Sequence, residues 1–318
     1  MNIEMIRAAA KRIDGHARRT PILSSPFLDD IAGRRVFVKA ECLQHTGSFK
    51  FRGAWSAISM LSPDQIKAGV IAFSSGNHAQ GIALAAQQHG APAVIIMPAN
   101  APAIKIANTR AYGAEVVLYD RATEDRDEIG ARLAAERGLT LIKPYDEPLV
   151  IAGQGTCGLE IAQELGDLSA DVTVCCGGGG LTSGVAMALA ADAPKMRVRP
   201  VEPVGFDDVT RSLASGQIMR NAQLDGSLCD AIIKRSLSSH PAADTHSSNC
   251  HTSPTPSFCV SRRMPIMSNQ NNCSRSGCHN DPSPNSQTLV SNIVASIMAR
   301  PHHKRQRLSR PCRQLLQR

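Results

Sequence analysis

Aromatic residues and long apolar runs are both scarce in this sequence. Phe, Trp and Tyr make up 3% of its 318 residues, so alanine and the aliphatic side chains must form most of the core. No run approaches the roughly 18 consecutive apolar residues that a membrane helix needs. The first 15 residues carry charges at helical spacing, where a secretory signal would have an apolar stretch. These absences predict a cytoplasmic protein without a membrane span, whose cysteines are reduced.

Glycine is nearly absent from the last part of the chain. Residues 233–318 hold one of the 24 glycines, but 16 serines and half of the ten cysteines. They also hold 12 Lys and Arg against two Asp, whereas residues 1–232 are mildly acidic. The net charge of +8 for the whole chain therefore comes from this last part. Such a composition cannot bury enough apolar surface to offset the entropy of ordering, which predicts a disordered basic tail. Its one sizeable apolar run, residues 289–298, is predicted as a marginal helix.

Up to residue 232, short β-branched runs alternate with alanine-rich stretches of helical character. The predicted strands are residues 36–40, 69–73, 93–97, 115–119, 140–143, 172–176 and 197–201. The predicted helices are residues 50–61, 77–88, 102–112, 123–137, 149–165 and 181–190. Strands joined by crossover helices indicate parallel sheets and an α/β fold.

One motif, SFKFRGA at residues 48–54, places a lysine in the first turn of a predicted helix. Ser48 can cap this helix. The positive end of a helix disfavours an ammonium group, so the pKa of Lys50 should fall and its free amine should react more readily with a carbonyl. A lone lysine in such a place is more often a solvated surface charge. The motif therefore needs support from the rest of the chain.

Two further motifs follow predicted strands. SSGNHAQG at residues 74–81 presents hydroxyls and backbone N–H groups at a helix N-terminus, which would suit a carboxylate. GGGG at residues 177–180 lets the backbone wrap closely around an anion, and a phosphate is the natural guest. It is neither the dinucleotide fingerprint nor a P-loop, because the required spacing and the Lys-Ser/Thr pair are missing. An ordinary helix cap and a plain flexible turn are the respective alternatives.

Together with PYDEP at residues 144–148, GQGT at 153–156 and EP at 202–203, these motifs resemble the serine/threonine dehydratases and serine racemases. Those enzymes are fold-type II enzymes that depend on pyridoxal phosphate (PLP). The resemblance implies a two-domain α/β fold like that of the tryptophan synthase β subunit, with parallel sheets. Residues 1–62 and 147–232 would form the larger, PLP-binding domain, and residues 63–146 the smaller one. The tract at residues 97–114 also resembles the smaller domain of the family, and we interpret it as a mark of lineage more than of chemistry.

The resemblance also implies roles in catalysis and in binding the cofactor. Lys50 would form a Schiff base with PLP and take the substrate α-proton. In the racemases a serine at the position of Ser75 is the acid/base on the opposite face. The cofactor would be held by Phe49 against its ring, Asn77 at its 3-hydroxyl, and Gly177, Gly178, Gly179 and Gly180 at its phosphate.

A substrate site and a metal site are implied in the same way. Ser74, Ser75 and His78 would bind the carboxylate of an amino-acid substrate. Glu202, Asp208 and the carbonyl of Phe206 would supply a Mg²⁺ or Ca²⁺ site, since both ions prefer oxygen ligands. A solvated acidic turn is the alternative for this last group.

The predicted reaction is an α,β-elimination that converts a β-hydroxy amino acid, such as L-threonine or L-serine, to a 2-oxo acid and ammonia. β-Hydroxyaspartate is equally compatible with the sequence, and racemisation is an alternative because of Ser75. Relatives of this kind imply a homo-oligomer.

The resemblance ends near Ile232. The family continues into a strand followed by Ser/Cys-Gly-Gly-Asn, which binds the PLP ring nitrogen, and residues 276–278 do not match that motif. We therefore interpret residues 233–318 as the product of a shifted reading frame, and an inactive remnant is the alternative to an active dehydratase. A nucleic-acid-binding role for KRQRLSR at residues 304–310 is a weaker alternative, because no aromatic stacking residues accompany the charge.

Overall fold

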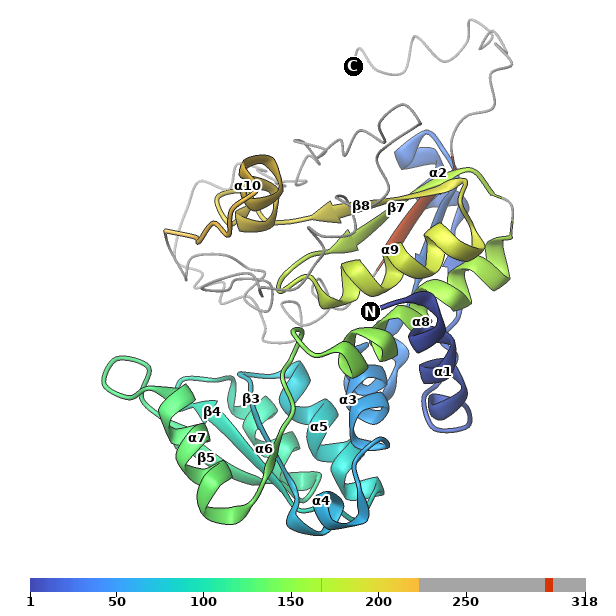
Figure 1. Cartoon of the computed structure of the whole chain (residues 1–318). Helices are drawn as coiled ribbons and strands as arrows, with labels where there is room; N and C mark the ends of the chain where they lie inside the picture. Colours follow the sequence, from blue (N-terminus) through green and yellow to red (C-terminus); the bar gives the residue numbers. More distant parts are fainter. Residues whose placement is uncertain (167, 223–294, 300–318) are drawn as a thin grey trace, which may run out of the picture.

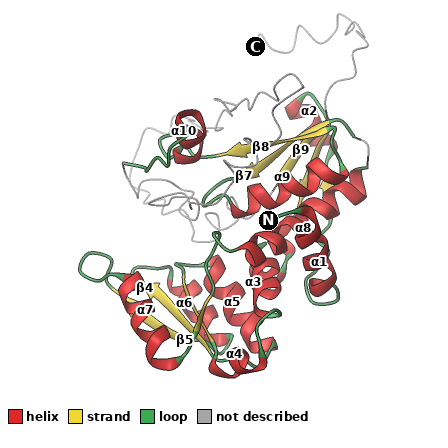
Figure 2. Cartoon of the chain, viewed as in Figure 1, coloured by secondary structure: helices red, strands yellow, loops and turns green. Residues whose placement is uncertain are grey.

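The computed structural model describes residues 1–166, 168–222 and 295–299. These residues form two lobes, each built on its own sheet, with α3 (Lys50–Ile58) and α8 (Pro148–Leu165) near the junction (Figure 1). The two groups of strands are separate in Figure 2, and helices cover them. No helix in the described part of the chain is both long and apolar enough to cross a membrane.

The smaller sheet is parallel throughout and has helices on both faces. Its strands, in the order β5-β4-β3-β6, are β5 (Glu115–Tyr119), β4 (Ala93–Pro98), β3 (Val70–Phe73) and β6 (Thr140–Leu141). Successive residues of β3 and β4 point to opposite faces. One set packs with α3 and α5 (Asn77–Gln88), and the other packs with α7 (Arg126–Arg137). Burial on both faces explains why these strands are apolar at nearly every position.

The larger sheet is mixed. Its order is β1-β2-β9-β7-β8, formed by β1 (Ile22–Ser24), β2 (Val36–Lys39), β9 (Ala295–Ala299), β7 (Ala170–Cys175) and β8 (Met196–Val201). Only β7 and β8 are parallel, whereas β1–β2, β2–β9 and β7–β9 are antiparallel. The buried side chains of β7 pack with α8 and α9 (Gly180–Asp192). The other described elements are α1 (Ile3–Ile13), α2 (Pro26–Ala32), α4 (Pro63–Ala68), α6 (Ala103–Ala111), α10 (Asp208–Ser215) and the 3₁₀ helices η1 (Glu41–Leu43) and η2 (His45–Gly47).

Helix α8 packs closely against both α3 and α9, because glycines lie where the helices meet. A Cβ at Gly153 would be 2.5 Å from the carbonyl oxygen of Arg52, and a Cβ at Gly184 would be 2.7 Å from the backbone nitrogen of Gly155. No real side chain tolerates such distances, so glycine is required at both positions. This packing fixes the start of α3, which carries Lys50, relative to the start of α9, which follows the glycine turn.

A buried network of charged side chains lies at the same junction. Arg52 is completely buried, and its guanidinium lies 2.7 Å from Glu41 Oε1 and 2.6 Å from Glu160 Oε1. The Nζ of Lys39, on β2, lies 2.6 Å from Glu160 Oε2. Burial pulls the pKa of Glu160 upward, but the charges of Arg52 and Lys39 hold it below its ordinary value. The network thus links β2, η1, α3 and α8 through interactions that are largely shielded from solvent.

The strands and helices predicted before residue 233 are all present, with ends shifted by at most three residues. The antiparallel pairs of the larger sheet are the main departure from the parallel arrangement. The helix predicted for residues 289–298 is wrong for residues 295–298, and these residues are also the exception to the predicted disordered tail. They belong to β9, which pairs with strands on both sides and so satisfies its backbone without a helix. Residues 223–294 and 300–318, on which the reading-frame and nucleic-acid interpretations mainly rest, lie outside the described residues.

Candidate active site

Lys50 is the first residue of α3. Its backbone N–H donates to Ser48 Oγ at 3.2 Å, but the N-cap of α3 is Phe49 and not Ser48 as predicted. Its Nζ donates to the carbonyl oxygen of Pro144 at 2.7 Å and lies 5.2 Å from the centroid of the Phe49 ring. Burial lowers the pKa of the Lys50 amine from its ordinary 10.5 to about 8. Among the described residues, no carboxylate forms an ion pair with this amine. No ion pair with a carboxylate therefore raises its pKa.

The four glycines form the turn between β7 and α9. Gly179 has φ +83°, in the left-handed region, and caps α9. A Cβ at Gly178 would be 2.3 Å from Cγ of Tyr145, and a Cβ at Gly180 would be 2.9 Å from the Tyr145 carbonyl oxygen. Glycine is therefore required at positions 178, 179 and 180, and the turn leads into the N-terminus of a thirteen-residue helix. Such an arrangement is suited to a phosphate group.

Pro144 and Tyr145 connect Lys50 with the glycine turn. The Lys50 amine donates to Pro144, and the ring of the next residue lies against Gly178. The Lys50 amine also interacts electrostatically with Cys175, which is the last residue of β7 and lies two positions before the turn. The structure therefore brings together two motifs that are 127 positions apart in the sequence. Tyr145 is the residue that sequence reasoning missed here, although it lies within the PYDEP motif.

The turn that contains Ser74 and Ser75 lies at the start of α5. Ser74 Oγ accepts a hydrogen bond from the backbone N–H of Gly76 at 3.1 Å, and α5 begins at Asn77. One helical turn later, Gly81 packs against α3, where a Cβ would be 3.2 Å from the carbonyl carbon of Lys50. This contact places the start of α5 beside the start of α3. All three predicted motifs thus meet in one region of the molecule.

His78 is more deeply placed than a substrate-binding side chain usually is. It is buried, and its Nε2 lies 3.1 Å from the carbonyl oxygen of Ile142, just after β6. The ring therefore ties α5 to the chain that leaves the smaller sheet. Its contact with a substrate carboxylate stays a prediction.

The predicted cation site finds no support in the geometry. Glu202 accepts hydrogen bonds from the backbone N–H groups of Val209 and Thr210, both at 2.9 Å, and thus caps α10. Asp208 is buried and accepts from Asn221 at 2.7 Å, and Phe206 is a buried side chain. Burial raises the pKa of both carboxyl groups, and their hydrogen bonds offset this only in part. Within the described part of the chain, no cluster of three or more Asp, Glu, His or Cys side chains could hold a metal ion.

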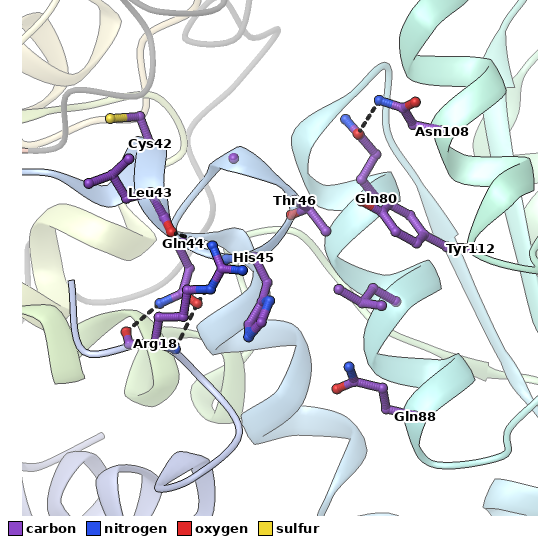
Figure 3. Close-up of a pocket in the computed structure, with 12 residues that line it drawn as sticks. Arg18, Cys42, Leu43, Gln44, His45, Thr46, Gln80, Gln88, Asn108 and Tyr112 are labelled. Carbon is purple, nitrogen blue, oxygen red and sulfur yellow. Dashed lines mark hydrogen bonds between the residues drawn. The ribbon is translucent and has the colours of Figure 1, made fainter.

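A separate polar hollow of about 550 Å³ lies between η2 and the helices of the smaller lobe (Figure 3). Arg18, Gln44 and His45 line one side, and Gln80 and Tyr112 line the other. None of the predicted catalytic or cofactor-binding residues lines it.

Comparison with known proteins agrees with this arrangement. The model of the family described as "Pyridoxal-phosphate dependent enzyme" matches residues 13–248, and the chain belongs to that family. An L-threo-3-hydroxyaspartate ammonia-lyase of Pseudomonas sp is 54% identical over 211 residues, which are 66% of each chain. The serine racemase of Schizosaccharomyces pombe is 47% identical over 67% of this chain and 66% of its own. The match thus spans slightly less than two thirds of the length of these curated relatives.

The fold is also that of a solved relative. The threonine deaminase of T.th. superposes with a TM-score of 0.69 and 45% sequence identity, over 74% of this chain and 76% of the other. The family implies PLP, and the residues present fit it. The glycine turn leads into the N-terminus of α9, which suits a phosphate, and Lys50 offers an amine of lowered pKa that contacts the neighbouring Pro144.

Proposed function

We propose that this chain is an ammonia-lyase that acts on a β-hydroxy amino acid with the help of PLP. The observation that carries the proposal is the half-buried Lys50, whose amine has a lowered pKa and no carboxylate partner among the described residues. Pro144 and Tyr145 link this amine to the glycine turn. When bound, PLP would supply an electron sink for the loss of the substrate α-proton. The protein would supply orientation and proton transfer.

Each part of the site has a distinct task in this proposal. The backbone of residues 177–180 would hold the phosphate, while Phe49 and Asn77 would bound the ring. The Nζ of Lys50 would accept the α-proton, because a pKa of about 8 leaves part of the amine unprotonated near neutral pH. Ser74, Ser75 and His78 would orient the substrate through its carboxylate. The β-hydroxyl would then leave as water, and the enamine that results would tautomerise to an imine, which water hydrolyses to a 2-oxo acid and ammonia.

L-threo-3-hydroxyaspartate is the first substrate to test. The Pseudomonas relative that carries this name is 54% identical, a higher value than for the serine racemase of S. pombe or the threonine deaminase of T.th.. L-threonine and L-serine are the other two substrates to compare. We expect a homo-oligomer, which light scattering would test.

Racemisation is the second candidate activity. Ser75 is partly exposed and belongs to the turn before α5, whereas Lys50 belongs to α3. Racemisation requires an acid/base group on each face of the substrate, and Ser75 would be the second such group beside Lys50. Formation of D-serine from L-serine, lost on Ser75→Ala while ammonia release persists, would favour this activity.

Cofactor uptake and turnover of the full chain together test the proposal. Purified protein incubated with PLP should acquire the visible absorbance of the bound cofactor, and Lys50→Ala should abolish it. Lys67→Ala, on the exposed face of α4, is the matched control and should leave it unchanged. Ammonia release should then be highest with L-threo-3-hydroxyaspartate. A chain that never takes up PLP refutes the proposal, and uptake without ammonia release from any of the three substrates identifies an inactive remnant.

A further inference from the structure

Lys105 is a buried lysine whose amine has no partner in the described part of the chain. It is the third residue of α6, and 9% of its surface is exposed. Its backbone makes ordinary contacts, since its carbonyl oxygen accepts from Thr109 Oγ1 at 2.7 Å. Its Nζ, by contrast, forms neither a hydrogen bond nor an ion pair with another described residue. A lysine side chain that is this enclosed, with no carboxylate paired to it among the described residues, is uncommon.

The end of this side chain lies against the turn that precedes α5. A Cβ at Gly76 would be 2.6 Å from Cδ of Lys105 and 2.9 Å from its Nζ. The glycine therefore leaves the space that the lysine occupies. The helices α5 and α6 lie side by side in the smaller lobe (Figure 1), and Asn108 Nδ2 donates to Gln80 Oε1 at 3.2 Å between them (Figure 3). The position of Lys105 relative to the turn is thus set by the packing of two helices.

Two sources of positive potential meet at this point. The ammonium of Lys105 is one, and the N-terminus of the twelve-residue helix α5, which begins directly after Gly76, is the other. A cation in the first turn of a helix opposes the helix dipole, so the lysine does not stabilise α6 by its charge. A concentration of positive charge that no described carboxylate neutralises favours an anion from outside the protein.

We propose that Lys105 is a binding residue for the α-carboxylate of the substrate, acting together with the turn at residues 74–77. The turn offers hydroxyl and backbone N–H groups, and the ammonium offers the charge that the turn itself lacks. This inference rests on the proposed function, because it assigns the anion to an amino-acid substrate. It changes the interpretation of the tract at residues 97–114 from a mark of lineage to a part of the site.

Carboxylate binding tests the proposal without recourse to catalysis. The full chain would be titrated with propionate and with succinate at constant ionic strength, with and without PLP, and the affinity taken from the rise in Tm. Lys105→Met should weaken the binding of both probes by at least about tenfold, as expected for the loss of one charge-assisted hydrogen bond. Lys105→Arg should retain most of the affinity, and Lys67→Met, on exposed α4, should bind as the unmodified chain does.

Each result has a defined meaning. Unchanged binding of propionate by Lys105→Met, or no binding of either probe by the unmodified chain, would overturn the proposal. A loss confined to succinate would overturn it as well, because Lys105 would then recognise a second carboxylate. If Lys105→Met does not fold, Lys105→Gln replaces it in the same comparison. A chain that binds both probes through Lys105 but takes up no PLP would retain this inference while the proposed function fails.

Discussion

Replacing Lys50 with methionine should stabilise the protein in the absence of PLP. Lys50 is half-buried, desolvation lowers the pKa of its amine to about 8, and the amine donates to the carbonyl of Pro144. A folded-state pKa below the unfolded value of 10.5 means that the folded protein binds this proton less tightly than the unfolded chain does. The protonated lysine therefore opposes folding. Methionine keeps a side chain of similar length and removes the charge.

The shift sets the size and the pH dependence of the effect. A pKa lowered from 10.5 to about 8 corresponds to about 3 kcal/mol, at about 1.4 kcal/mol per unit. Below pH 8 both states hold the proton and the penalty is present in full. Between pH 8 and 10.5 the folded protein releases it first, so the unmodified chain gains stability with rising pH. Loss of the hydrogen bond to Pro144 costs the variant about 1 kcal/mol at every pH. Lys50→Met should thus be about 2 kcal/mol more stable at pH 7.

Urea unfolding of the full chain without PLP, followed at several pH values from 7 to 9.5 under reducing conditions, measures this difference. The advantage of Lys50→Met should be greatest at pH 7 and should decrease above pH 8, by about 1.4 kcal/mol per pH unit at most. Lys67→Met, on the exposed face of α4, should differ little from the unmodified chain at any pH. An advantage that does not change with pH, or a variant less stable at pH 7, would refute the assignment of Lys50 as a destabilised, buried amine.

Two further substitutions test the cofactor cradle and the buried charges. Gly178→Ala places a Cβ 2.3 Å from the ring of Tyr145, so the turn must shift, and we expect PLP affinity to fall by at least about tenfold in an absorbance titration. Retention of the original affinity would show that the turn is not the phosphate site. Arg52→Met leaves the fully buried Glu41 without its cation and should cost about 3–5 kcal/mol in urea unfolding at pH 7. A cost below about 1 kcal/mol would mean that solvent reaches the network.

Local patterns in the sequence were sufficient to predict most elements before residue 233. The apolar strands β3 and β4 and the helix α5 have periodicities and turn residues that depend on few neighbours. Patterns of this kind did not predict β9, because an apolar run of that length is compatible with a helix or a strand. Its pairing with β2 and β7 decides the outcome. The short helices α2, α4 and α10 were also not predicted, since their few residues give little periodic signal.

The candidate site shows the same division. The sequence alone determined which groups are available: a lysine at a helix start, a polyglycine turn after a strand, and a serine-rich turn after another. Only the tertiary structure decided that Tyr145 covers Gly178, that Pro144 accepts from Lys50, and that Lys105 lies against Gly76 without a partner among the described residues. The physical reason is that a pKa, a close approach or an unpaired charge depends on which distant segments share a volume. That depends on how helices pack, and here on the close packing of α3 and of α9 against α8 at glycine contacts.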